Sequence, residues 1–417
     1  MAVFLFICSF VTKTMRRCMA IVAGLAMMVS CGLKEIGGEL PQKNEGIWKG
    51  PGADLKPGGP GSVKRSVWYV TGFDYPEGYD WMSDPEAGSV RCSLVVYANA
   101  VPMLKIPVGT EYQTSAAPDM HRMIEGDLYT DFSTDSMTVI KKNGKYLFSY
   151  PGREMMIGMH ADSSGVYTLG QSRQGKGFSF RRDGGLLFEN AKGDLLGHMV
   201  VTDGGCVFAF SEKVAGAGKE RYYLYRDGKV SQIAVREDVR KVLDVTVSDG
   251  EVYYIATLTG ITHPVLVCED GMYMLEFPLS VRVDSCRFIA AEGEILIEGV
   301  FSTHTGLMTS GLWRKEVREC IFPAGMVLWA SCTDGGGVSC LLAHCSTDDL
   351  RISRCGELIA FPEGYTAMGT APLAMVDGIL HVGMTSMEGA QPAVWMDGDL
   401  KKLNFNGYIS SISVWEP

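Results

Sequence analysis

The sequence predicts an all-β protein built from repeated four-stranded antiparallel units, and its turns are the first evidence. Two-residue turns of the Asp-Gly or Asn-Gly type join short apolar runs and recur about every 43 residues. Both central residues of a type I′ turn need positive φ, which Asp, Asn and Gly adopt readily. Each turn is therefore expected to close a β-hairpin. The turns, two of them degenerate, are Asn99-Ala100, Asn143-Gly144, Asp183-Gly184, Asp227-Gly228, Asp270-Gly271, Arg314-Lys315, Cys355-Gly356 and Asp397-Gly398.

A second series of glycines runs out of phase with the first. Each of these glycines precedes a β-rich run, so every repeat holds two hairpins, or four strands A to D. In the fifth repeat, we expect strand A at 242–247, B at 252–258, C at 265–268 and D at 272–277. The glycines are Gly126, Gly165, Gly205, Gly250, Gly293, Gly336 and Gly378.

Prolines at the end of strand D give the third observation. Proline has no N–H to donate, so it is tolerated at a sheet edge and at a strand exit. Four strands in a period of 40 to 45 residues are typical of a propeller blade, whose strand D is outermost. The prolines are Pro107, Pro151, Pro278, Pro323 and Pro362.

Residues 65–417 are therefore predicted to form an eight-bladed β-propeller, with seven blades as the alternative if one repeat is irregular. The first repeat begins with a strand-B sequence at Ser66 and has no strand A before it. A strand-A sequence, Tyr408 to Val414, follows the last repeat. We expect this C-terminal strand to complete blade one, because closure removes an exposed sheet edge.

Composition narrows the range of partners. The 417 residues carry a formal charge of −10, and residues 1–30 contain three basic residues and no acidic one. Removal of that segment would leave a charge of −13. Such acidity argues against non-specific nucleic-acid binding, which depends on basic surface.

The N-terminal region reads as an export signal. In residues 1–30, Arg16 and Arg17 precede an apolar run that is too short to span a bilayer. This order predicts a signal peptide. Met15 is a more natural start than Met1, because the basic residues then come directly after it. The sequence Leu25 to Cys31 resembles a lipoprotein signal, which implies a lipid on Cys31. Residues 31–64 are rich in Gly and Pro and are expected to form a flexible tether.

The longest B–C connection, 73–88 in blade one, is the best candidate for ligand binding. It holds four aromatic and five acidic residues. Aromatic faces beside carboxylates suit a sugar ring or a protein partner. The candidates are Tyr75, Tyr79, Asp80 and Trp81. The alternative, that the three aromatic residues simply cap the closure of the ring, is the simpler explanation. His263 and His304, on B–C loops of neighbouring blades, are weaker candidates.

Twelve cysteines are present, and none forms a Cys-x-x-Cys pair. Most lie in strand sequences, where Cys serves as a small buried apolar residue. Export permits disulfides, and Cys332 and Cys340 flank one hairpin turn, so they are the pair we would expect to bond.

No motif predicts catalysis, a cofactor or a metal. His121, His160 and His198 fall on successive A strands, but at unequal distances from the following strand B. Asp127, Asp131 and Asp135 lack the glycine and terminal Glu of an EF-hand loop. The sequence also lacks a Gly-x-Ser-x-Gly, a P-loop and a dinucleotide fingerprint.

The repeat period of residues 66–417 and the signal at 15–31 together resemble β-propeller lipoproteins of the Gram-negative cell envelope. The resemblance implies a monomeric propeller held at a membrane through Cys31, anchored to the outer membrane. Three functions are compatible with it: a non-enzymatic module that binds a glycan or protein partner through the B–C and D–A loops, a scaffold subunit of an envelope complex, and an exported carbohydrate-active enzyme using loop carboxylates. The predicted fold does not decide among them.

Overall fold

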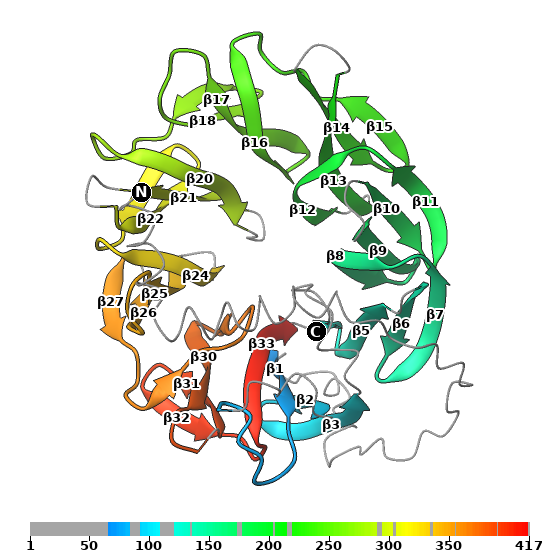
Figure 1. Ribbon diagram of the computed structural model, residues 1–417, viewed down its shortest axis with the longest axis vertical. Helices are drawn as coiled ribbons and strands as arrows, with labels where there is room; N and C mark the ends of the chain where they lie inside the picture. The colour runs from blue at the N-terminus through cyan, green and yellow to red at the C-terminus, as the bar shows by residue number, and fades with distance from the viewer. Residues whose placement is uncertain are drawn as a thin grey trace, which may run out of the picture.

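The chain forms a closed ring of eight antiparallel sheets, shown in Figure 1, in a computed structural model. The ring confirms the eight-bladed propeller over the seven-bladed alternative. Seven sheets contain four strands and the eighth contains five. The structure describes residues 66–83, 92–108, 121–133, 136–172, 177–202, 205–214, 219–289, 294–302, 306–333, 337–354, 356–389 and 391–415.

Blades one to four follow the predicted order from the inner strand outward (Figure 1). Blade one contains β33 (Gly407–Trp415), β1 (Val67–Asp74), β2 (Cys92–Ala98) and β3 (Val101–Val108). Blade two contains β4 (His121–Ile124), β5 (Asp127–Ser133), β6 (Met137–Lys142) and β7 (Lys145–Pro151). Blade three contains β8 (Glu154–Asp162), β9 (Gly165–Ser172), β10 (Phe178–Arg182) and β11 (Gly185–Asn190). Blade four contains β12 (Asp194–Thr202), β13 (Gly205–Lys213), β14 (Glu220–Arg226) and β15 (Lys229–Gln232).

Blades five to seven repeat the pattern. Blade five contains β16 (Val239–Ser248), β17 (Glu251–Leu258), β18 (Val265–Cys268) and β19 (Gly271–Met274). Blade six contains β20 (Arg282–Ile289), β21 (Leu296–Ser302), β22 (Met308–Arg314) and β23 (Val317–Ile321). Blade seven contains β24 (Met326–Thr333), β25 (Val338–His344), β26 (Leu350–Arg354) and β27 (Glu357–Ala360).

Blade eight differs because its inner strand is split. β28 (Tyr365–Thr366) and β29 (Leu373–Val376) both pair with β30 (Ile379–Ser386), which continues to β31 (Pro392–Met396) and β32 (Asp399–Lys402). The backbone between the two pieces bonds to neighbouring blades. The N–H of Ala371 donates to Ser410 O of β33 at 3.2 Å, and the indole Nε1 of Trp329 in blade seven donates to Gly369 O at 3.2 Å. This segment therefore joins three blades.

The turns of blades two, three, four and eight adopt the backbone conformation that their residues predicted. Asn143, Asp183, Asp227 and Asp397 have φ between 44° and 50°, and the glycine after each also has positive φ. In blades five and six the turn lies one residue away from the predicted pair: Cys268 pairs with Gly271 and Arg314 with Val317, so the turn residues are Glu269-Asp270 and Lys315-Glu316. In blade five, the expected strands A to C are confirmed within three residues at either end. Strand D ends at Met274 rather than at 277, because Leu275 and Phe277 leave the ladder and enter the core between blades.

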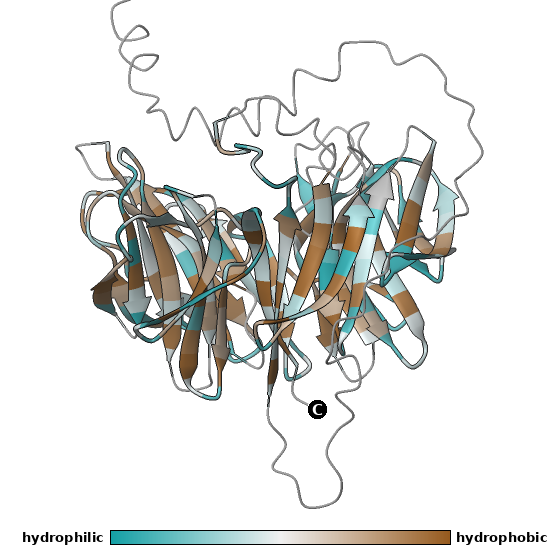
Figure 2. Cartoon of the chain, turned by 90° about the horizontal axis from the view of Figure 1, so that it is seen from below, coloured by the Kyte–Doolittle hydropathy of each residue, from teal (hydrophilic) through white to brown (hydrophobic). Residues whose placement is uncertain are grey.

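Apolar residues pack between the faces of adjacent blades, and brown segments alternate with paler and teal ones along the strands in Figure 2. The inner strands also share an irregularity. Register shifts interrupt the pairing of β8, β12, β16, β20, β24 and β33 with their neighbours. Such bulges increase local twist and leave backbone groups for other partners.

The C-terminal strand closes the ring as expected. β33 pairs antiparallel with β1, from Val67 opposite Trp415 to Asp74 opposite Gly407. Beyond that end, the N–H of Tyr75 donates to Asn406 O at 2.7 Å. A side chain at Gly407 would collide with the carbonyl oxygen of Phe73, so only glycine allows the strands to approach this closely.

The predicted signal peptide, Cys31 and tether lie outside the described residues. Within the part of the chain that the structure describes, no helix has the length and apolar character to cross a membrane.

We expect Gly407→Ala to lower the melting temperature by several degrees, because the added Cβ forces β33 away from β1 at the closure. Circular dichroism during heating measures this effect. Gly389→Ala is the matched control, since a Cβ there meets nothing within 4 Å. Equal melting temperatures for the two variants would contradict a closure that depends on this contact.

Candidate binding groove at the ring closure

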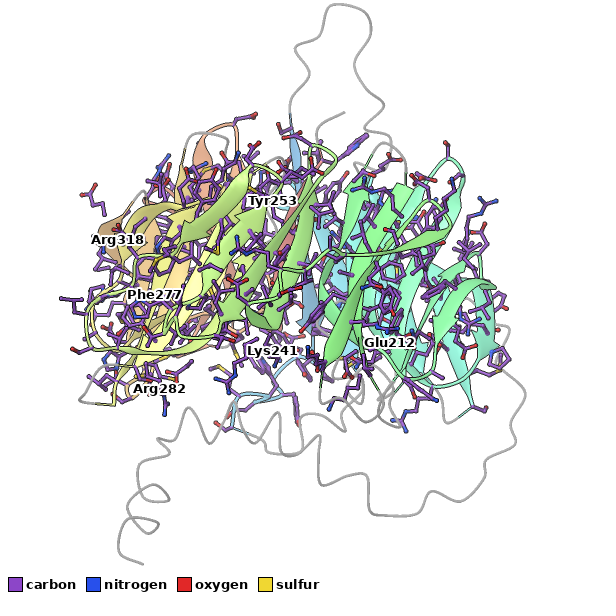
Figure 3. The ribbon with its side chains drawn as sticks, turned by 90° about the horizontal axis from the view of Figure 1, so that it is seen from above. Glu212, Lys241, Tyr253, Phe277, Arg282 and Arg318 are labelled. Atoms are coloured by element: carbon purple, nitrogen blue, oxygen red, sulfur yellow. The ribbon has the colours of Figure 1, made fainter. Side chains whose placement is uncertain are left out.

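A groove with a volume of about 1060 Å³ lies where blade one meets blade eight. Its walls come from the B–C loop of blade one after β1, the B–C turn of blade eight after β30, and the connection from β32 to β33. It therefore opens on the loop face, opposite the tight turns. Figure 3 shows this division: Lys241, Arg282 and Glu212, close to the loops, lie on one side of the ring, and Tyr253, beside a tight turn, lies on the other.

Tyr75 and Trp81 are part of the core beneath this groove. Trp81 is only 5% exposed, and its ring stacks on Tyr75 at 5.6 Å with an interplanar angle of 10°. Trp81 also contacts Tyr408 of β33 at 5.3 Å. Tyr75 still lines the groove, whereas Trp81 does not. The two rings thus cap the ring closure, which was the alternative explanation of these aromatics.

Tyr79 and Asp80 lie on the surface of the groove. Asp80 is exposed and its Oδ1 accepts a hydrogen bond from the Ser83 N–H at 3.2 Å. Tyr79 is half-buried. The amide Nδ2 of Asn406 donates to Pro76 O at 2.8 Å and to Tyr79 O at 2.9 Å. One amide therefore fixes the loop of blade one to the strand that closes the ring.

The groove carries a net negative charge. Asp74 pairs with Lys105 at 2.6 Å and its other oxygen accepts the Asn406 N–H at 3.0 Å. These two charges cancel, while Glu77, Asp80 and Glu388 are exposed around them. Groups that accept hydrogen bonds therefore dominate its surface, and it favours neutral or positively charged ligands.

The two candidate histidines are not brought into the groove. His263 lies before β18 in blade five, where its ring packs on Phe277 with 5.5 Å between centroids. His304 lies outside the described residues.

Cys332 and Cys340 lie on paired strands but point to opposite faces. The register places Cys332 opposite Ser339 and Cys340 opposite Ser331. Since successive side chains alternate between faces, Cys332 packs toward blade eight and buried Cys340 toward blade six. The structure does not bring the two sulfur atoms together.

The histidines of the inner strands do not form a common site. His121 is buried edge-on against Phe73 at 5.5 Å. His160 has Nε2 at 3.7 Å from Asp162, and His198 of β12 is exposed. In the described part of the chain, no group of three or more His, Cys, Asp or Glu side chains has an arrangement suited to a metal ion.

The sequence interpretation missed two buried acidic side chains, one that joins neighbouring blades and one that joins the strands of blade six. Asp244 of β16 accepts the Phe288 N–H of β20 at 2.7 Å, and burial raises the pKa of its carboxyl. Glu298 is 2% exposed and binds Arg287 at 2.8 Å and the Ser310 hydroxyl at 3.0 Å. The sequence does contain a signal for them, because an acidic residue inside an apolar strand sequence indicates a buried carboxylate that needs a partner.

Comparison with known proteins adds little about activity. No protein-family model and no curated protein matches this chain. Among solved structures, an acylaminoacyl peptidase of Pyrococcus horikoshii is 10% identical with a TM-score of 0.44, over 78% of this chain and 57% of that one. The β-propeller domain of the Trilobed protease from Pyrococcus furiosus is 11% identical with a TM-score of 0.41, over 72% of this chain and 96% of that one. This chain thus spans little more than half the length of the first, and the fold assignment rests on the strand order above.

We expect stability to fall as the pH is lowered from about 6.5 toward 4. Burial lowers the pKa of His121 from 6.5 to about 4, so in this interval the unfolded chain binds a proton that the folded chain does not. The loss is at most about 1.4 kcal/mol per pH unit for this group. Urea unfolding at pH 7 and pH 5 measures it. His121→Leu should reduce the difference between the two pH values, whereas an unchanged difference would contradict the assignment to His121.

Proposed function

We propose that the protein is a binding module whose groove at the ring closure holds a glycan. The observation that carries this proposal is a groove of about 1060 Å³ on the variable loop face, with its shape fixed by Asn406. This size matches that of small-molecule sites, and ligand residues are commonly held on loops by a rigid scaffold. Amides and carboxylates around a partly exposed Tyr79 supply hydrogen bonds and a stacking face for a sugar.

The charge of the groove narrows the class of glycan. Three exposed carboxylates surround one neutralised ion pair, so a polyuronate would be repelled. Neutral sugars and amino sugars have hydroxyl or ammonium donors that complement these acceptors. The ligand is therefore proposed to be a neutral or amino-sugar oligosaccharide.

We further propose export and lipid attachment at Cys31, with the flexible segment 31–64 between lipid and ring. The support is the order of basic residues, apolar run and cysteine in residues 15–31. A lipid at this position would hold the propeller at a membrane as an envelope lipoprotein.

A thermal-shift screen tests the glycan proposal. The sample is the full chain carrying Cys31→Ser, and the panel contains neutral, amino-sugar and uronate oligosaccharides. Ligand bound only to the folded state raises the melting temperature by mass action. We expect a rise with neutral or amino sugars that Tyr79→Ala and Asp80→Asn remove. Tyr146→Ala, on the outer edge of blade two, should keep it. No rise across the panel would refute the proposal.

Mass spectrometry of the mature chain from a lipoprotein-producing bacterium tests lipid attachment. We expect the wild-type N-terminal peptide to begin at Cys31 and to carry a diacylglyceryl mass. Cys31→Ser should abolish this mass. An unmodified wild-type peptide, or cleavage at another residue, would refute the proposed anchor.

A further inference from the structure

The C–D turns of blades two and three carry the same pattern, which the glycan groove does not use. Two basic residues precede each turn and two exposed apolar residues follow it. Tyr146 and Leu147 are 62% and 39% exposed, and Leu186 and Leu187 are each 50% exposed. We call these four side chains the apolar rim. Exposed apolar residues gathered in this way mark an interaction surface more often than singly scattered ones do.

A bulge in the outer strand presents each pair. Ile140 pairs with Phe148 and Lys141 with Tyr146, which leaves Leu147 as an extra residue. Phe180 pairs with Phe188 and Arg181 with Leu186, which leaves Leu187 as an extra residue in the same place. A bulge turns the strand locally, so consecutive side chains face outward instead of alternating.

Blade six has the same bulge with different chemistry. There Leu312 pairs with Cys320 and Trp313 with Arg318, and the extra residue is Glu319. The two residues at the bulge, Arg318 and Glu319, are thus charged, although the exposed Val317 precedes them. The bulge itself therefore does not require apolar side chains. Their presence in blades two and three is specific to the sequences of those two turns.

The two turns form one surface. A Cβ placed at Gly184 in the turn of blade three would lie 3.2 Å from the Phe148 ring of blade two. Exposed Lys145 and Arg182 flank the four apolar residues. By contrast, the equivalent turn of blade five is Glu269-Asp270, and the whole chain is acidic. A surface that is both basic and apolar is therefore not shared by every C–D turn.

This surface lies next to the point where the chain enters the ring. Strand β1 begins at Val67, and a Cβ at Gly126, in the A–B turn of blade two, would lie 3.1 Å from the Tyr69 hydroxyl. The next residue, Asp127, binds Lys142 of the C–D turn at 2.7 Å. The segment that leads from Cys31 therefore joins the propeller on the same face as the apolar rim.

We infer that the apolar rim, with Lys145 and Arg182, is a contact surface for an anionic lipid bilayer. Leu and Tyr side chains insert at the level of the headgroups, and the basic side chains bind anionic headgroups. The cellular setting rests on the proposed lipid at Cys31, because an anchored chain would keep this face of the propeller close to a bilayer. Contact on this face turns the groove at the ring closure away from the membrane.

Vesicle sedimentation of the full chain carrying Cys31→Ser tests the surface without a lipid anchor. One set of vesicles contains phosphatidylcholine alone, and the other also contains phosphatidylglycerol. We expect binding to the second set that weakens as salt is added. Leu186→Ser with Leu187→Ser, and separately Lys145→Glu with Arg182→Glu, should weaken it about tenfold or more.

Val317→Ser with Arg318→Glu is the matched control, because it changes an apolar and a basic side chain beside the blade-six bulge, and Arg318 is labelled in Figure 3. This variant should bind as well as the parent chain. Absence of vesicle binding by the parent, or equal loss in the control, overturns the inference. Because all samples lack Cys31, a failure of lipid attachment in the mass-spectrometry test leaves this result unaffected.

Discussion

The antiparallel pairing of β33 with β1 is the constraint on which the rest of the ring depends. It joins the two ends of the propeller over eight residues of β1. Without it, blade one would be a three-stranded sheet with an unpaired inner edge, and the core between blades one and eight would lose Ile409 and Ile412. The same contact creates the groove, because the residues before β33 form one of its walls. The closure of the ring and the groove therefore both depend on this strand and the residues before it.

Most of the fold was predictable because most blades contain a tight turn whose residue types can be recognised in the sequence. Residues such as Asp183-Gly184 restrict the backbone to positive φ, and that restriction is local. The spacing of these turns predicted four strands in each repeat. It also indicated that blade one lacks an inner strand, which the C-terminal strand supplies. Some strand ends were predicted incorrectly, such as the end of β19. That end depends on the packing of Leu275 and Phe277 between blades, which is a tertiary contact that the local sequence does not determine. The split of the blade-eight inner strand was missed for the same reason.

The loop chosen from the sequence lines the groove, but the structure does not place all of its candidate side chains on the groove surface. Aromatic residues at Tyr75, Tyr79 and Trp81 look alike in sequence, yet burial separates Trp81 from Tyr79. The far wall, which includes Asn406 and Glu388, comes from residues more than 300 positions away. Neither the residue types of the turns nor the repeat period predicts that these residues lie close to the loop of blade one. The role of the buried Asp244 was not predictable either, because its carboxylate accepts a hydrogen bond from Phe288 in the next repeat.

The split inner strand of blade eight has a consequence for how the ring opens. In the other blades the described inner strand is continuous, and its backbone bonds stay mostly within the blade. In blade eight, Ala371 exchanges backbone bonds with β33, and Gly369 accepts one from Trp329 of blade seven. Separation of β33 from the ring therefore also releases the centre of blade eight. Amides on both sides of the seam should exchange with solvent hydrogen in one cooperative unit, so the seam behaves as a single foldon rather than as two adjoining blades.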